Sequence, residues 1–397
     1  MGDDQNVFRA AKALATYPVT RALICWTTGV ATFCPILARI AVSRILFSRL
    51  AGNLLSRHGL PTLKSILFIF GIFLAAALVS AALCVLLRPL LVRYALARPG
   101  ARSSHKVPTP QGGGIAVMGG VVAATGIALF AFGANPFLMV ALVATGALAV
   151  LGAWDDIRPL PALQRLLIQA AAVGFLVGMV PFPPKILTGI VPLPVEIALV
   201  VLAGVWFVNL TNFMDGIDWI TVAGLVPLGA TLGVLGLVGA VYPHVAILGM
   251  AMAGALIGFA PFNKPVARLF LGDVGSLPLG LLTFFLLWQL AGNGGLVAAI
   301  LLPLYHVSDA TITLMMRLWR RERVWEAHRS HFYQRATDNG LSVIQVVTHA
   351  FVLNAALAAL AVATLYWSSV AMQVAALAIG LGLTGFVLWR FSDRQAR

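Results

Sequence analysis

Six aspartates lie at the ends of strongly apolar segments, where a charged side chain is costly. They are Asp155, Asp156, Asp215, Asp218, Asp273 and Asp309. On insertion scales a charged residue costs about 2.5–3.5 kcal/mol at the centre of a membrane span, and less near its ends. A lone aspartate at a helix end is more often a cap. Several carboxylates gathered in one place suit a divalent cation and the phosphates that it binds.

The acidic pair in WDDIRP is the least well explained by helix capping. The adjacent carboxylates of Asp155 and Asp156 repel each other, so a positive group should lie beside them. Arg158 is a local candidate, and so is a divalent cation. In NLTNFMDGID, Asp215 and Asp218 stand between two apolar stretches.

Two glycine-rich segments could bind an anion. In LFLGDVGSLPLG, Asp273 lies between Gly272 and Gly275 at an expected helix start, where backbone N–H groups favour phosphate. The P-loop spacing is absent, so this segment predicts a phosphate or metal site of another kind. In HKVPTPQGGG, Lys106 precedes the glycines 112–114, which predicts either an anion cradle or a juxtamembrane charge cluster before a loose helix start.

The longest polar segment, 317–340, adds basic groups. His328 and His331 would share a face if they were helical, and Arg329 follows the first of them. Histidine and arginine grip phosphate through charge-assisted hydrogen bonds. Zinc would need further ligands that this segment lacks. The alternative is a solvated basic loop.

Two polar residues lie within the apolar segment before this loop. His306 and Asp309 are intramembrane groups, which mark functional sites by default. The alternative for Asp309 is an ion pair with an arginine across the bundle.

The elements that carry these residues are membrane spans. The chain of 397 residues is 60% hydrophobic and 10% charged, whereas soluble domains carry about 25% charged residues. Mean hydropathy is +0.95. We expect an all-α polytopic membrane protein, a bundle of about 10–11 transmembrane helices with an active-site cleft that faces the cytosol. The candidate spans are 66–92, 113–133, 136–153, 163–181, 193–210, 219–241, 243–262, 274–291, 295–317, 344–366 and 370–390.

The basic charge follows this topology. Of 27 Lys and Arg, eighteen lie at or near one set of span ends from Arg88 onward, and eight precede residue 65. Lys185 alone falls on the other side. Such asymmetry is the positive-inside rule, which assigns the basic ends to the cytosol. The net charge of +14 therefore does not indicate a nucleic-acid partner.

Three segments divide the chain. Residues 1–65 form an N-terminal extension that we expect to be peripheral or dispensable. Residues 66–390 form the integral membrane domain, and residues 391–397 form a cytosolic tail. The three cysteines lie in apolar surroundings without metal-ligand spacing, which favours buried thiols.

Five segments in order carry a resemblance to a known family. They are RSSHKVPTPQGGGIA, GAWDDIRPL, NLTNFMDGID, LFLGDVGSLPLG and AHRSHFYQR. They closely resemble the motifs of the polyprenyl-phosphate N-acetylhexosamine-1-phosphate transferase family (glycosyltransferase 4 family) over about residues 66–390. The residues of these motifs look most like those of the O-antigen-initiating branch. They depart from the related phospho-N-acetylmuramoyl-pentapeptide transferase, whose final loop carries a run of histidines, because Arg329 and Ser330 interrupt the run here.

The resemblance implies a reaction and its residues. The enzyme would transfer N-acetylhexosamine 1-phosphate from a UDP-sugar to undecaprenyl phosphate and release UMP, with Mg²⁺ or Mn²⁺ as cofactor. Asp155, Asp156 and Asp215 would be catalytic, the first two facing the lipid phosphate or metal. Asp273 and Asp215 would bind the metal. The substrate-binding residues would be Lys106, Asn209, Asn212, Asp218, His328, Arg329 and His331.

The expected setting is the bacterial inner (cytoplasmic) membrane, with a multi-pass chain, a cytosolic active site and a homodimer as the plausible assembly. Membrane lipids, undecaprenyl phosphate and a UDP-N-acetylhexosamine are the partners. Two alternatives remain open: the peptidoglycan transferase, and an ion-coupled membrane transporter, since transporters also carry intramembrane carboxylates. Direct attack by the lipid phosphate is favoured over a covalent aspartyl-phosphate, because that phosphate is already ionised at pH 7.

Overall fold

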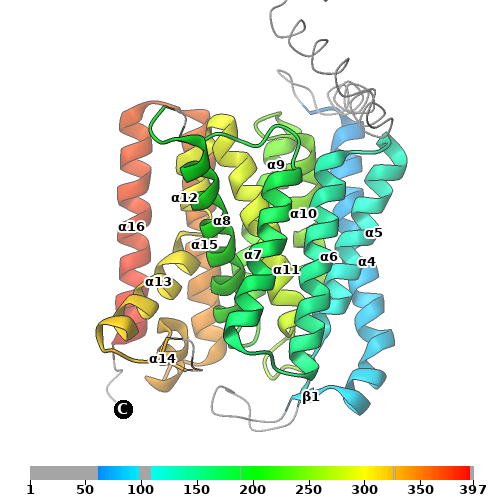
Figure 1. The fold of residues 1–397 in the computed structure, drawn as a ribbon, viewed down its shortest axis with the longest axis vertical. Coiled ribbons are helices and arrows are strands. Elements are labelled where there is room, and N and C mark those ends of the chain that lie inside the picture. The colour runs from blue at the N-terminus through cyan, green and yellow to red at the C-terminus, as the bar shows by residue number, and fades with distance from the viewer. Residues whose placement is uncertain (1–60, 98–108, 188, 325, 327, 394–397) are drawn as a thin grey trace, which may run out of the picture.

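The structure is a computed structural model that describes residues 61–97, 109–187, 189–324, 326 and 328–393. Most of the expected N-terminal extension 1–65 lies outside these residues, as does Lys106. The described chain forms a bundle of long helices that run between two ends (Figure 1).

Helices make up nearly all of the described chain. In order they are α4 (Leu63–Tyr94), α5 (Gly113–Phe132), α6 (Pro136–Ile157), α7 (Ala162–Met179), α8 (Leu193–Phe213), α9 (Ile220–Leu237), α10 (Pro243–Phe259), α11 (Asp273–Leu290), a π-helical turn η1 (Ala291–Gly295), α12 (Leu296–Leu301), α13 (Leu304–Trp319), α14 (Phe332–Asp338), α15 (Val343–Tyr366) and α16 (Val370–Ser392). The short strands β1 (Leu96–Ala97) and β2 (Thr109–Pro110) pair antiparallel.

The expected membrane fold is confirmed. Within the described residues, nine helical stretches are long and apolar enough to cross a membrane, and α10 is an apolar helix of 17 residues. The span expected at 295–317 is divided into α12 and α13 at Pro303, whose ring nitrogen has no hydrogen to donate. Before it, Asn293 and Gly294 leave helical geometry, so the chain turns after α11.

Local capping explains where several helices begin. The Asn135 side chain accepts from the Leu138 amide at 3.0 Å just before α6. Ser342 and Gln345 form a reciprocal capping box at the start of α15. Each cap satisfies a backbone N–H that has no partner within its helix.

Helix α11 is the central element of the bundle. Every residue of α11 after Asp273 is buried, and the helix contacts α5, α6, α8 and α10. Asp273 is its first residue and is only partly buried. The packing therefore places one carboxylate at the middle of one end of the bundle.

Glycines bring two helices close to the start of α11. A Cβ on Gly114 of α5 would lie 2.2 Å from the Gly275 Cα, and one on Gly152 of α6 would lie 2.2 Å from the Asp273 carbonyl oxygen. The Gly113 and Gly114 amides donate to the carbonyls of Phe270 and Leu271, each at 2.8 Å. These two amides are therefore engaged in backbone pairing, which argues against the expected anion cradle at this point.

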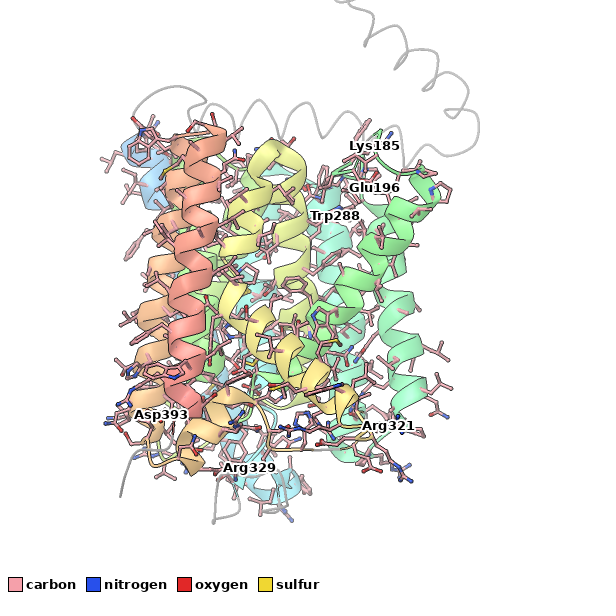
Figure 2. The ribbon with its side chains drawn as sticks, turned by 90° about the vertical axis from the view of Figure 1, so that its left-hand side faces the viewer. Lys185, Glu196, Trp288, Arg321, Arg329 and Asp393 are labelled. Atoms are coloured by element: carbon pink, nitrogen blue, oxygen red, sulfur yellow. The ribbon has the colours of Figure 1, made fainter. Side chains whose placement is uncertain are left out.

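The two ends of the bundle differ in their polar groups. Lys185 and Glu196 lie at one end, whereas Arg321, Arg329 and Asp393 lie at the other (Figure 2). Helices α6 and α8 finish at this second end, and α9 and α11 begin there (Figure 1). The acidic segments at these helix ends thus share one face of the molecule, as the sequence predicts. Glu196 stabilises the loop between α7 and α8, because its carboxylate accepts from the Ile186 and Leu187 amides at 2.5 and 2.9 Å.

Candidate active site

Asp156 ties three parts of the chain together at the acidic end. Its carboxylate accepts from the amides of Asp273 and Val274 at 2.9 and 3.1 Å, and so caps the N-terminus of α11. The Gln111 side-chain amide donates to the same carboxylate. Gln111 also forms a backbone bridge with Phe270. Asp156 thereby fixes α6, α11 and the β2 segment relative to one another.

Asp155 has a positive partner, but not the one that the sequence suggests. Its carboxylate is 7% exposed, and it accepts from Arg165 of α7 at 2.9 Å and from the Leu160 amide at 2.6 Å. The Arg165 guanidinium also lies 3.9 Å from the Asp273 carboxylate. Arg165, rather than Arg158, is the cation beside Asp155, because α7 folds back beside the end of α6.

Asp273 is bonded to the end of α8. The Asn212 side-chain amide donates to the Asp273 carboxylate at 2.7 Å and to the Ser276 hydroxyl at 2.9 Å. The Asp273 side chain remains 26% exposed. It can therefore reach a ligand from solvent while Asn212 holds it in place.

Asp215 lies in the turn between α8 and α9, outside both helices. Burial raises the pKa of its carboxyl to about 8, against the lowering effect of a hydrogen bond from Thr221. The negative charges of Asp273, Asp156 and Asp218 raise the pKa further. The four carboxylates therefore lie close enough together for their charges to interact.

Asp218 and Asn209 have bonds within the protein. The buried Asp218 carboxylate accepts from the Ala267 amide at 3.0 Å and so links the turn to the α10–α11 loop. The Asn209 amide donates to Gln169 of α7 at 2.7 Å and to the Val205 carbonyl at 2.8 Å. Asn209 thus faces α7 within the bundle, one turn before Asn212.

The histidine loop lies against the Asp215 turn. The Tyr333 hydroxyl donates to the Phe213 carbonyl at 2.7 Å, and a Cβ on Gly216 would lie 2.2 Å from that hydroxyl. Rings of His328 and His331 lie 4.8 Å apart. They do not lie on a helix, the case in which the sequence would place them on one face, because α14 begins only at Phe332 and His331 is its extended N-cap residue.

The other members of this loop are bonded locally. His328 Nδ1 pairs with the Ser330 hydroxyl at 2.8 Å, and Arg329 pairs with Asp338 at 3.1 Å. His331 Nδ1 lies 3.2 Å from the Asp309 carboxylate. The side chain that faces Asp309 is therefore a histidine and not the arginine considered from the sequence.

The donor set suits a hard cation without enclosing one. Among the described residues, no group of three or more His, Cys, Asp or Glu side chains could hold a metal ion. Mg²⁺ usually binds through one or two carboxylates together with water and substrate phosphates, so a complete protein cage is not required. The carboxylates around Asp215 and the exposed Asp273 carboxylate fit such an oxygen-liganded divalent cation.

Four residues that contact the acidic end of the bundle were not predicted from the sequence. They are Arg165, Gln111, Thr221 and Tyr333. Arg165 carried a usable signal, since it is a charged residue inside the expected span 163–181. The other three are polar residues of ordinary types, and only the fold brings them to the carboxylates.

The fold and site together define a polytopic helical membrane protein whose acidic and histidine groups gather at one end. The glycosyl transferase family 4 model matches residues 138–291, from α6 into η1. The chain belongs to this family. The matched region holds the acidic residues from Asp155 to Asp273, and the histidine loop follows it.

Three curated relatives illustrate the similarity. A probable undecaprenyl-phosphate N-acetylglucosaminyl 1-phosphate transferase from Bacillus subtilis (strain 168) is 27% identical over 67% of this chain and 78% of its own length. A decaprenyl-phosphate N-acetylglucosaminephosphotransferase from Mycobacterium tuberculosis (strain ATCC 25618 / H37Rv) is 32% identical over 47% of this chain, and the match spans about half (52%) of the relative. A phospho-N-acetylmuramoyl-pentapeptide-transferase from Synechococcus sp. (strain JA-3-3Ab) is 34% identical over 55% of this chain and 70% of the relative.

Proposed function

We propose that the protein transfers N-acetylhexosamine 1-phosphate from a UDP-sugar to undecaprenyl phosphate and releases UMP. The product would start a lipid-linked cell-surface glycan such as O-antigen. Family membership and the names of the relatives support the reaction class. The single observation that carries the proposal is that Asp156, Asp215 and Asp273 lie together at one end of the bundle. The first and third are close enough to Asp215 to raise the pKa of its carboxyl.

The proposed reaction joins two anions. A phosphate monoester loses its second proton near pH 6, so the lipid phosphate is already a nucleophile at pH 7. One of its oxygens forms a bond to the sugar-linked phosphorus of the UDP-sugar. The bond from that phosphorus to the bridging oxygen breaks, and UMP leaves with this oxygen. Positioning and charge neutralisation are then the main tasks of the protein.

The contacts of the acidic pair support direct attack over an aspartyl-phosphate. The Asp155 carboxylate is paired with Arg165 and bonded to the Leu160 amide. The Asp156 carboxylate accepts from two amides of α11 and from Gln111. A nucleophilic aspartate would have to give up these bonds, which hold the helices together.

Mg²⁺ or Mn²⁺ is the proposed cofactor, held by Asp215 and Asp273. When bound, the ion would neutralise diphosphate charge. Asn209 and Asn212 on α8, together with Asp218 in the α8–α9 turn, would shape the nucleotide pocket. Lys106, His328, Arg329 and His331 would bind phosphate oxygens. The active site would face the cytosol at the bacterial inner membrane, and a homodimer is the proposed assembly.

The sugar is proposed to be N-acetylglucosamine, as in the names of the Bacillus and mycobacterial relatives. The Synechococcus relative is named as a phospho-N-acetylmuramoyl-pentapeptide-transferase, so the peptidoglycan precursor is a second candidate substrate. Against it, Arg329 and Ser330 separate the two histidines of the final loop.

The test uses detergent-purified protein with undecaprenyl phosphate, Mg²⁺ and a panel of UDP-N-acetylhexosamines, including the pentapeptide-bearing nucleotide. We expect UMP release that needs both lipid and metal, and that the Asp273→Asn variant abolishes. UMP release without lipid would contradict the proposal. Folded protein that releases no UMP with any sugar would favour the transporter alternative.

A further inference from the structure

Asp309 is a fully buried carboxylate that the proposed reaction does not yet use. It lies on α13 and has no exposed surface. Its Oδ1 accepts from the Phe332 amide at 3.0 Å and from Thr313 at 3.4 Å, and its Oδ2 accepts from the Tyr333 amide at 3.1 Å. A buried carboxylate is costly unless its bonds serve the structure or the function.

The remaining partner of Asp309 is the His331 ring. Nδ1 of His331 lies 3.2 Å from Asp309 Oδ1. An ionised carboxylate only accepts hydrogen bonds, so the Nδ1 atom must carry the hydrogen. The ring is also packed between aromatic neighbours, with centroids 6.0 Å from Phe213 and 5.8 Å from Tyr333. Its orientation is therefore fixed on several sides.

The second ring nitrogen of His331 is left for another ligand. Nε2 has no hydrogen-bond partner in the part of the chain that the structure describes. The His331 side chain is 4% exposed, and Nε2 is not among the wholly buried polar atoms that lack a partner in the described residues. The Tyr333 hydroxyl holds this loop on the Phe213 carbonyl, two residues before Asp215. The His331 ring is thus held beside the segment that leads to Asp215.

We propose that Asp309 is a positioning residue for the transfer reaction: it accepts a hydrogen bond from Nδ1–H of His331 and orients the ring so that Nε2, when it too carries a hydrogen, donates to a phosphate oxygen of the substrate. The proposal rests on the proposed function, since it assigns the ligand of His331 as a phosphate. A carboxylate bonded to Nδ1–H fixes both the tautomer and the ring orientation of a histidine. The two amides at the start of α14 hold the same carboxylate, so ring and loop are aligned by one group.

The side chain must be a carboxylate for this purpose. Oδ1 faces the His331 ring and the Phe332 amide, while Oδ2 faces the Tyr333 amide. Asparagine has the same shape, but its NH₂ group would face a donor at one of these positions. In Asp309→Asn the ring would relieve this conflict by giving up the Nδ1 hydrogen, and a neutral ring lacks the positive charge that strengthens a hydrogen bond to phosphate.

The first test needs no activity. In histidine-¹⁵N-labelled wild-type protein, with His331 assigned by its loss in His331→Gln, we expect ¹⁵N shifts of a ring with Nδ1 protonated. A wild-type ring that is neutral with its hydrogen on Nε2 would overturn the proposal. This measurement stands even if Asp309→Asn does not fold.

The second test measures coupling through UMP release. We expect Asp309→Asn to lower kcat/KM by about 10–100-fold, the usual effect of losing such an orienting partner. In the His331→Gln background the same change should cost less than about twofold, because Asp309 acts through His331. Thr313→Val removes only the 3.4 Å donor to the same carboxylate and should leave kcat/KM near wild type.

An equal loss from Asp309→Asn in both backgrounds would overturn the proposal and leave Asp309 with a purely structural role. Failure of the proposed function is recognised separately. In that case wild-type protein releases no UMP with any UDP-sugar, while the ¹⁵N measurement still decides whether Asp309 sets the His331 tautomer.

Discussion

At the scale of single residues, the most informative group is Asp215. Its pKa of about 8 lies well above that of an aspartate in an unfolded chain, because of burial and the charges of neighbouring carboxylates. Between about pH 4 and pH 8 the folded state therefore binds more protons than the unfolded state. Stability is consequently lost as pH rises through this window, and the loss is complete above pH 8.

We expect Asp215→Asn to separate function from stability. UMP release should fall by about 10²–10³-fold, because an amide replaces one of the two carboxyl groups proposed to hold the metal. The melting temperature at pH 8 should match or exceed that of wild type, because the amide cannot ionise. Thermal unfolding in detergent at pH 5 and pH 8, beside the activity assay, gives both values. A melting temperature that falls together with activity would make Asp215 a structural cap instead.

Arg165 is predicted to be a stability residue. Arg165→Met leaves the buried Asp155 carboxylate without its cation and should lower the free energy of unfolding by about 2–4 kcal/mol. The double variant Asp155→Asn/Arg165→Met removes both charges and should recover part of the loss. Melting temperatures of the single and double variants check this. Additive losses would show that the pair contributes nothing as a pair.

The residue scale also shows what the sequence can predict. The cost of burying charge identifies the six aspartates and the end of the bundle where the acidic segments gather, because it depends only on residue type and hydropathy. Partner choice depends on the fold. Arg165 is ten residues from Asp155, and Asp309 is 22 residues from His331, yet each pair is in contact.

At the scale of elements, the start of α11 is defined by close backbone packing. Gly114 and Gly275 meet where α5 crosses α11, and the space between them is too small for a side chain. Asp273 lies two residues before Gly275, so its position depends on this crossing.

We expect Gly114→Ala to destabilise the acidic end. Its Cβ would lie 2.2 Å from backbone, so the helices must separate, at a cost of about 1–3 kcal/mol. Gly126→Ala on the same helix has no atom within 4 Å of its new Cβ and is the matched control, expected to be neutral or slightly stabilising. Melting temperatures compare the two. Equal effects would show that the crossing is not tight.

Element boundaries were less predictable than element type. Hydropathy predicts the long helices, because length and composition alone fit them to a bilayer. It does not locate the break at Pro303 within an otherwise apolar stretch. It also cannot show that His331 precedes α14, since that boundary is set by Asp309 accepting from the first amides of the helix.

At the scale of the whole molecule, charge asymmetry predicts orientation. Lys185 and Arg321 lie at opposite ends of the bundle, and both are exposed (Figure 2). In a variant without native cysteines, Lys185→Cys should react with a membrane-impermeant thiol reagent on intact cells. Arg321→Cys should react only after permeabilisation, because basic loops remain in the cytosol. The reverse pattern would place the acidic end outside.

The central place of α11 also constrains biogenesis. Four of its neighbours, α5, α6, α8 and α10, precede it in the chain and are therefore synthesised before it, whereas α12 follows it. Until α11 arrives, the small-residue faces at Gly114 and Gly152 have nothing to pack against, and the Asp156 carboxylate lacks the two amides that it caps. The acidic end of the bundle therefore takes its final arrangement only once α11 has inserted among the helices that precede it.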